Sequence, residues 1–207
     1  MGKKLVIYGD SNTWGYDPAD WENGRYKEER CWPYLLSKSL DPVWDVLPRG
    51  LNGRRLPDLR LDREVVLQMV SLTEPDGMLM IMLGTNDLLQ TISPDASVPA
   101  GKMQMLLEFL LNKNRIKAPA LLITAPVPIG AENHPDGLMR RYYEESLKMN
   151  RAFARLAGQY GTQFADAAGW DIDMAYDYVH FSEQGHCSFA EHMSDLLRQL
   201  IRLPSGG

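Results

Sequence analysis

Short apolar runs alternate along this 207-residue chain with longer segments whose apolar residues recur every three to four positions. The short runs resemble buried strands, and the longer segments predict amphipathic helices. This alternation predicts an open, mostly parallel sheet with helices on both faces, in a single domain spanning residues 1–207. Residues 77–83 are apolar throughout, which predicts a central strand, whereas residues 162–164 predict an edge strand. The predicted strands cover residues 5–8, 43–47, 77–83, 120–124 and 162–164, and the predicted helices cover residues 62–72, 101–111, 138–160 and 183–203.

The composition is typical of a globular protein with a substantial core, with 44% hydrophobic and 24% charged residues. The net charge of -5 argues against a nucleic-acid-binding protein, which normally has a basic face. The first apolar run ends before Asp10, too early for a signal peptide, and no run approaches the roughly 20 apolar residues of a membrane span. We therefore expect a cytoplasmic protein without a nucleic-acid or membrane partner, and the sequence leaves open whether it forms a homo-oligomer.

The two cysteines, Cys31 and Cys187, lack the paired spacing of a thiolate zinc site. We expect two buried, free thiols, although one disulfide is compatible with the sequence. The Asp and His residues between positions 171 and 186 raise the alternative of a metal site, but they include no HExxH-like pair and no third soft ligand. We therefore expect neither a metal nor another cofactor.

Polar motifs follow the first three predicted strands. GDSNTWG (residues 9–15) follows the first strand, PRGLNGRR (48–55) the second and GTND (84–87) the third, while DYVH (177–180) comes shortly before the last helix. Ligands of parallel sheets bind beyond the carboxyl ends of the strands, so we expect these motifs to gather at one edge. A helix N-cap is an alternative interpretation of the polar residues 10–12.

These residue types match nucleophilic catalysis by serine. A serine hydroxyl becomes a good nucleophile when an imidazole takes its proton, and the imidazole needs an acceptor that fixes its tautomer. Asp177 lies three residues before His180 and can reach Nδ1, which leaves Nε2 to face Ser11. The backbone N–H groups of Ser11 and Gly53 and the side-chain amide of Asn86 are candidate donors to an oxyanion.

Several alternatives are open from the residues alone. His186 is an alternative to His180 as the base, and Asp171 and Asp173 also precede His180. Gly50 is an alternative to Gly53 as oxyanion donor. Asp10 is interpreted as a turn-stabilising residue, and Asp87 as a helix cap or a loop anchor. Arg54 and Arg55 are interpreted as solvated loop residues, with binding of an anionic substrate as the alternative. His134 lies in a predicted loop, and His192 is expected at the surface.

The four motifs, in this order, closely resemble the blocks of the SGNH (GDSL-type) hydrolase family, and the resemblance spans the whole chain. It implies a three-layer α/β/α sandwich of flavodoxin-like type with about five strands. It also implies ester hydrolysis without a cofactor, with Ser11 as nucleophile, His180 as general base and Asp177 as its orienting partner. Asn12 departs from the pattern, because the signature usually has Leu there. The SNTWG run and residues 30–32 look like the arylesterase and acyltransferase members.

We therefore predict a serine hydrolase that cleaves small carboxylic esters through an acyl-enzyme, which water or an alcohol then resolves. Small aryl or alkyl esters are the first expected substrates and O-acetyl groups on carbohydrates the second, while a non-catalytic ligand-binding domain is the alternative from another class. Trp14 is expected to wall the substrate site. Short acyl groups should be preferred, because the connections after the strands look short and the longest insertion, residues 17–30, is rich in charge.

Overall fold

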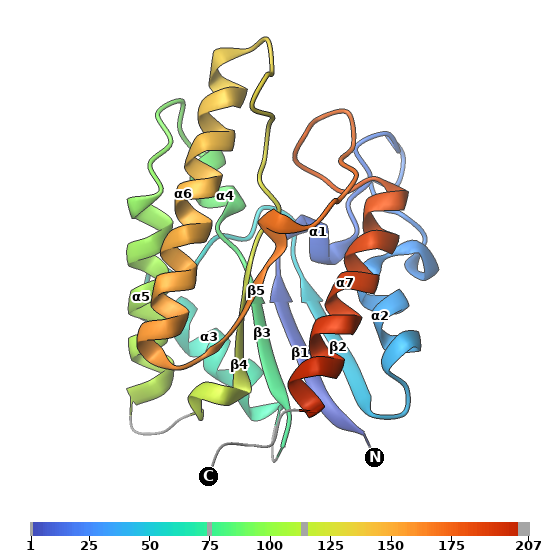
Figure 1. Ribbon diagram of the computed structural model, residues 1–207, viewed down its shortest axis with the longest axis vertical. Helices are drawn as coiled ribbons and strands as arrows, with labels where there is room; N and C mark the ends of the chain where they lie inside the picture. Colours follow the sequence, from blue (N-terminus) through green and yellow to red (C-terminus); the bar gives the residue numbers. More distant parts are fainter. Residues whose placement is uncertain (1, 74–75, 113–115, 203–207) are drawn as a thin grey trace.

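A five-stranded parallel sheet forms the centre of the computed structural model, which describes residues 2–73, 76–112 and 116–202 (Figure 1). Its strand order is β2-β1-β3-β4-β5, and all neighbouring strands run parallel. This is the flavodoxin-like order, in which the topology reverses between β1 and β3. The predicted fold class is thus confirmed. The strands are β1 (Lys3–Gly9), β2 (Trp44–Gly50), β3 (Met78–Met82), β4 (Leu121–Ala125) and β5 (Gln163–Asp166).

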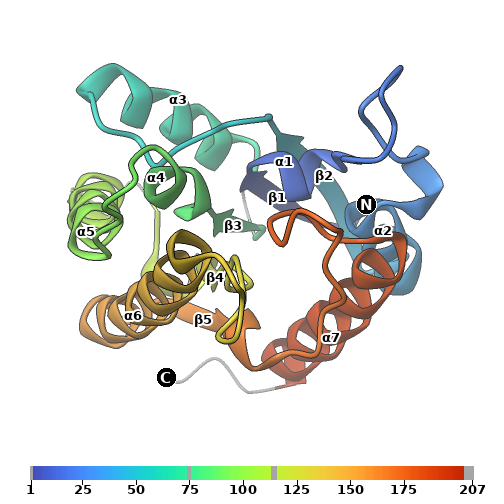
Figure 2. The same cartoon turned by 90° about the horizontal axis from the view of Figure 1, so that it is seen from above.

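Helices cover both faces of the sheet, because alternate residues of the central strands point in opposite directions (Figure 2). Leu5 and Ile7 of β1 pack on one side, with α2 and α7. Val6 and Tyr8 pack on the other side, with α3, α5 and α6. The longer helices are α2 (Trp32–Leu40), α3 (Arg60–Ser71), α5 (Ser97–Leu111), α6 (Gly137–Tyr160) and α7 (Glu183–Arg202), and the short 3-10 helices are η1 (Glu28–Arg30), η3 (Ala118–Ala120) and η4 (Ala167–Gly169).

Several element boundaries differ from the sequence-based expectation. β2 extends beyond the predicted residues 43–47 and passes through Pro48, which is tolerated because β2 lies at an edge of the sheet. α5 begins at Ser97 rather than at residue 101. α2 was not predicted; its proline lies in the first helical turn, where no intrahelical donor is lost. The predicted last helix reaches residue 203, which lies outside the described residues.

The candidate site residues gather at the carboxyl ends of the strands. Two short helices, α1 (Ser11–Trp14) and α4 (Thr85–Leu89), begin just beyond the neighbouring strands β1 and β3. Residues 126–136 and 167–182 form long connections at the same end, which Figure 1 shows above the sheet. The expectation that the connections after the strands are short is therefore wrong for these two connections. The predicted strands and helices already left residues 125–137 and 165–182 between elements, so this expectation disagreed with the predicted elements themselves.

Both cysteines are free thiols; Cys31 is buried as expected, whereas Cys187 is only half-buried. Among the described helices, none combines the length and the apolar character needed to cross a membrane.

Candidate active site

Ser11 is positioned by the turn that follows β1. Asp10 is the N-cap of α1, and its carboxylate accepts a hydrogen bond from the backbone N–H of Asn12 at 3.1 Å. The motif is therefore both a strand-end turn and a helix cap. Ser11 is the first residue of α1, so its backbone N–H has no carbonyl acceptor within the helix. Ser11 is only 7% exposed, because the segment around His180 packs against it.

Ser11, His180 and Asp177 form a continuous chain of hydrogen bonds. The Oγ of Ser11 lies 3.0 Å from Nε2 of His180, and Nδ1 of His180 lies 2.6 Å from Oδ2 of Asp177. The ring of Tyr16 packs on the imidazole, with 4.5 Å between the ring centroids. Sequence reasoning missed Tyr16, since nothing in its spacing marks it as a neighbour of His180. These hydrogen bonds allow a proton to pass from the Ser11 hydroxyl to the imidazole of His180, whose other nitrogen is held by the carboxylate of Asp177.

A tight turn holds Asp177 against His180. Oδ1 of Asp177 accepts hydrogen bonds from the backbone N–H groups of Val179 and His180, both at 3.0 Å. Tyr178 adopts a left-handed conformation, with φ of 57°, and its carbonyl accepts a hydrogen bond from Gly130 N–H at 2.8 Å. Burial alone would raise the pKa of Asp177, but the hydrogen bonds from the His180 ring and from the turn hold it below its ordinary value.

The loop after β2 presents Gly53 beside Asn86. Its turn is closed by a hydrogen bond from Arg54 N–H to the carbonyl of Leu51 at 3.1 Å, and Gly53 has φ of +71°, which favours glycine. Nδ2 of Asn86 donates to the carbonyl of Arg54 at 3.1 Å. Gly50, the alternative donor, ends β2, and a Cβ there would overlap the backbone of Thr13 and Trp14, so close packing of α1 on β2 requires a glycine at this position.

Arg54 anchors this loop to the sheet. Its guanidinium lies 4.1 Å from the ring centroid of Tyr8, and Nη1 donates to the carbonyls of Gly9, at 2.8 Å, and Arg49. Arg54 is therefore occupied within the protein and is neither a solvated loop residue nor an obvious anion ligand. Arg55 is exposed and donates to Gln90 instead.

Asp87 anchors the far end of the same loop. Its carboxylate accepts from the backbone N–H of Leu56 at 2.9 Å and from Nζ of Lys102 at 3.1 Å. The N-cap of α4 is Gly84, so of the two roles predicted for Asp87 the structure supports loop anchoring.

The alternative bases and acids lie elsewhere. His186 is fully buried, and its Nδ1 accepts a hydrogen bond from Trp32 N–H at 3.3 Å. Asp173 accepts from the hydroxyl of Ser182, and Asp171 is exposed. The other two histidines contact aromatic rings, where His134 meets Tyr178 edge-on and exposed His192 stacks on Trp170.

Two buried groups next to the hydrogen-bonded chain have displaced pKa values. Burial raises the pKa of Asp10 to about 6, against the opposing effects of the Asn12 N–H and of His180. Burial, together with the nearby His180, lowers the pKa of His186 to about 4. Both groups are therefore held toward their neutral forms.

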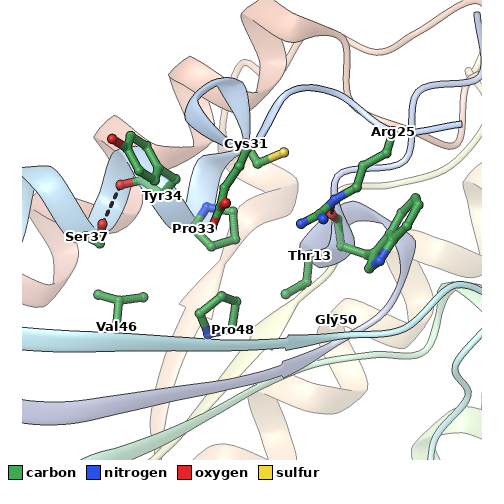
Figure 3. Close-up of a pocket in the computed structure, with 11 residues that line it drawn as sticks. Thr13, Arg25, Cys31, Pro33, Tyr34, Ser37, Val46, Pro48 and Gly50 are labelled. Carbon is green, nitrogen blue, oxygen red and sulfur yellow. Dashed lines mark hydrogen bonds between the residues drawn. The ribbon is translucent and has the colours of Figure 1, made fainter. Parts of the chain in front are cut away.

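Trp14 lines a cavity of about 160 Å³ between α2 and β2 (Figure 3). Arg25 lies across this cavity, where its Nε donates to the carbonyl of Trp14 at 2.8 Å and its guanidinium lies 4.9 Å from the indole centroid. Ser11 and His180 do not line the cavity, so it lies beside the hydrogen-bonded chain. Within the described residues, no group of three or more His, Cys, Asp or Glu side chains could hold a metal ion.

Comparison with known proteins identifies the chain's relatives. The model of the GDSL-like lipase/acylhydrolase family matches residues 7–187. No curated protein matches the sequence. A carbohydrate acetylesterase family member from Sinorhizobium meliloti is 25% identical, with a TM-score of 0.78 over 97% of this chain and 100% of its own. A protein from Agrobacterium tumefaciens, provisionally assigned as an arylesterase, is 30% identical, with a TM-score of 0.77 over 96% of this chain and 99% of its own. The aryl esterase of M. smegmatis, at 23% identity and a TM-score of 0.77 over 96% and 100% of the two chains, shares the fold.

Proposed function

The chain belongs to the GDSL-like lipase/acylhydrolase family and is a carboxylic ester hydrolase, and from this premise we propose that Ser11 is its nucleophile. The observation that carries the proposal is the hydrogen-bonded chain from Ser11 through His180 to Asp177. As the serine oxygen attacks the ester carbonyl carbon, Nε2 of His180 takes the hydroxyl proton. Asp177 holds the ring and stabilises the imidazolium that forms.

The tetrahedral intermediate then collapses to an acyl-enzyme. The bond between the carbonyl carbon and the alcohol oxygen breaks, and His180 gives its proton to that oxygen. The N–H groups of Ser11 and Gly53 and Nδ2 of Asn86 are the proposed donors to the oxyanion. Two observations support these donors. The backbone N–H of Ser11 has no acceptor within α1, and Asn86 contacts the loop that carries Gly53.

Water resolves the acyl-enzyme in hydrolysis, and an alcohol resolves it in acyl transfer. In both cases His180 takes the acceptor's proton and returns it to Oγ of Ser11, so the same groups serve both reactions. Acyl transfer therefore belongs to the proposal. A transfer assay in water with a primary alcohol as acceptor measures the partition between free acid and new ester.

Small aryl or alkyl esters are the proposed substrates, with Trp14 as a contact on the α1 side. The provisionally assigned Agrobacterium arylesterase, at 30% identity, supports this class. Carbohydrate O-acetyl esters are the second candidate, favoured by the 25% identical Sinorhizobium acetylesterase family member. Rates on p-nitrophenyl acetate and on an acetylated oligosaccharide, measured side by side, distinguish the two.

Labelling with a fluorophosphonate, followed by peptide mapping, tests the nucleophile. We expect the label on Ser11 in the native protein, and neither label nor ester turnover in Ser11→Ala. Ser37→Ala is the control, because the hydroxyl of Ser37 donates to the carbonyl of Tyr34 within α2. Labelling at another serine, or more than a few per cent of native turnover in pure Ser11→Ala, would contradict the assignment.

A further inference from the structure

The side chain of Asn12 connects the Ser11 turn to the backbone on both sides of His180. Its Nδ2 donates to the carbonyl of Val179 at 3.0 Å, and its Oδ1 accepts from the backbone N–H of Phe181 at 2.9 Å. These two peptide groups flank His180, and the contacts span more than 160 residues of sequence. One amide thus bridges the segment that carries the imidazole.

The orientation of this amide follows from its partners. A carbonyl can only accept and an N–H can only donate, so a single placement of Nδ2 and Oδ1 satisfies both bonds. Asn12 is 7% exposed, and its own carbonyl accepts from Nε1 of Trp32 at 2.9 Å. The bridge is therefore sheltered from water and fixed at its base.

We propose that Asn12 is a positioning residue that sets the distance between Ser11 and His180. The inference rests on the proposed function and deepens it. Within the part of the chain that the structure describes, the hydrogen bonds between α1 and residues 177–181 come from Ser11 and Asn12 alone. The Ser11 contact is the one that must change during the reaction, so Asn12 supplies the hydrogen bonds between these segments that last through it.

Asp177 has a different task. It belongs to the same turn as His180 and moves with it, so it orients the ring but cannot hold the turn against α1. Loss of the Asn12 bridge would leave the contact between Asp177 and His180 intact while freeing the turn relative to Ser11. A displacement of about 1 Å at such a contact can lower a rate by about 100-fold.

Asn12→Leu tests the proposal with the residue usual at this point of the family signature. We expect kcat for a short p-nitrophenyl ester to fall by about 10–100-fold, with KM within threefold of the native value. Crystal structures of both proteins should show the distance from Ser11 Oγ to His180 Nε2 lengthened beyond hydrogen-bonding range in the variant. Asn12→Asp provides a second variant if the first does not fold. It retains the acceptor for Phe181 and loses the donor to Val179, so its kcat should also fall.

Asn150→Leu is the matched control for lost stability. Asn150 is a buried amide whose Nδ2 donates to the carbonyl of Pro126 at 2.8 Å, and among the described residues its side chain makes no hydrogen bond to residues 177–181. We expect it to lower the melting temperature while kcat stays within twofold. A folded Asn12→Leu or Asn12→Asp with native kcat and an unchanged serine–histidine distance would overturn the inference. Absence of activity in the native protein would instead overturn the proposed function, and the structural comparison would still test the bridge.

Discussion

At the residue scale, the site depends on donors and acceptors held by partners from distant parts of the sequence. Asn86 illustrates this, because one amide proton of Nδ2 is engaged by the carbonyl of Arg54 at 3.1 Å. An amide nitrogen carries two protons, so the second is available to an oxyanion. The contact with Arg54 also fixes the amide before substrate binds, which is the condition for strong electrostatic stabilisation.

Asn86→Ala should therefore lower kcat for a short ester by roughly 10²–10³-fold, the usual cost of removing one oxyanion donor. Asn86→Asp preserves the shape and replaces the donor with an acceptor, so its kcat should fall at least as far. Steady-state kinetics on the two purified variants provide the measurement. Weakened binding with unchanged kcat would remove Asn86 from the oxyanion site.

At the element scale, the loop that carries Gly53 is held at both ends. Arg54 ties the loop to the end of β1 and lies over the Tyr8 ring, and Asp87 ties the end of the loop to α4 through Leu56. A lysine at position 54 cannot reproduce two carbonyl contacts together with the guanidinium contact over the Tyr8 ring. Position 55 is exposed and lacks these constraints.

Arg54→Lys should reduce kcat about tenfold, since the Gly53 donor loses its fixed position, whereas Arg55→Lys should stay within twofold. The two substitutions make the same chemical change at adjacent positions, so comparing their kcat values isolates the anchoring. Equal values for both variants would show that the loop holds its shape without Arg54.

At the scale of the whole molecule, we expect the site to favour short acyl groups. The charge-rich segment 17–30 supports this preference. The cavity of about 160 Å³ beside α1 is lined by neither Ser11 nor His180, so it does not measure the acyl site. Each buried methylene of an acyl chain is worth about 0.8 kcal/mol, which a long chain gains only in an apolar channel. Across p-nitrophenyl esters from acetate to palmitate, kcat/KM should peak at about two to four carbons. A peak at about eight carbons or beyond would reveal such a channel.

Folding stability should carry two opposing pH dependences. Folding raises the pKa of Asp10 to about 6, so its contribution to the free energy of unfolding declines as the pH rises from about 4 to 6. Folding lowers the pKa of His186 to about 4, so its contribution is complete above pH 6.5 and is lost as the pH falls toward 4. Each shift corresponds to about 3 kcal/mol.

Single substitutions should separate these two contributions. Asp10→Asn should gain stability relative to the native protein as the pH rises from about 4 to 6. His186→Gln should lose stability relative to the native protein over the same rise. Urea unfolding at four or five pH values measures both differences. A pH-independent difference for either variant would show that its group titrates alike in the folded and unfolded states.

Much of the fold follows from local patterns in the sequence. Residues such as Val6 and Leu79 alternate with Leu5 and Met78 in apolar strands, and this pattern requires a sheet covered on both faces. β5 lies at an edge of the sheet, which confirms the prediction for residues 162–164. Its short run is only partly apolar, as expected of an edge strand. Helix starts and the course of the long connections were less accessible, because caps and loop contacts depend on partners outside the segment. The single-domain organisation stays a prediction.

Motif and spacing identify which residues carry the reactive groups, and they place most of these residues just after predicted strands. Ser11, Gly53, Asn86, Asp177 and His180 were all identifiable from motif and spacing, and the contact between Asp177 and His180 is local enough to be read from three residues of separation. Their functional roles stay proposals. The contacts of Asn12 and Tyr16 with the His180 segment, and the anchoring of Arg54, become visible only in the folded protein. The physical reason is that hydrogen bonds and ring contacts are made over a few ångströms, and local sequence patterns do not specify which distant segments approach so closely.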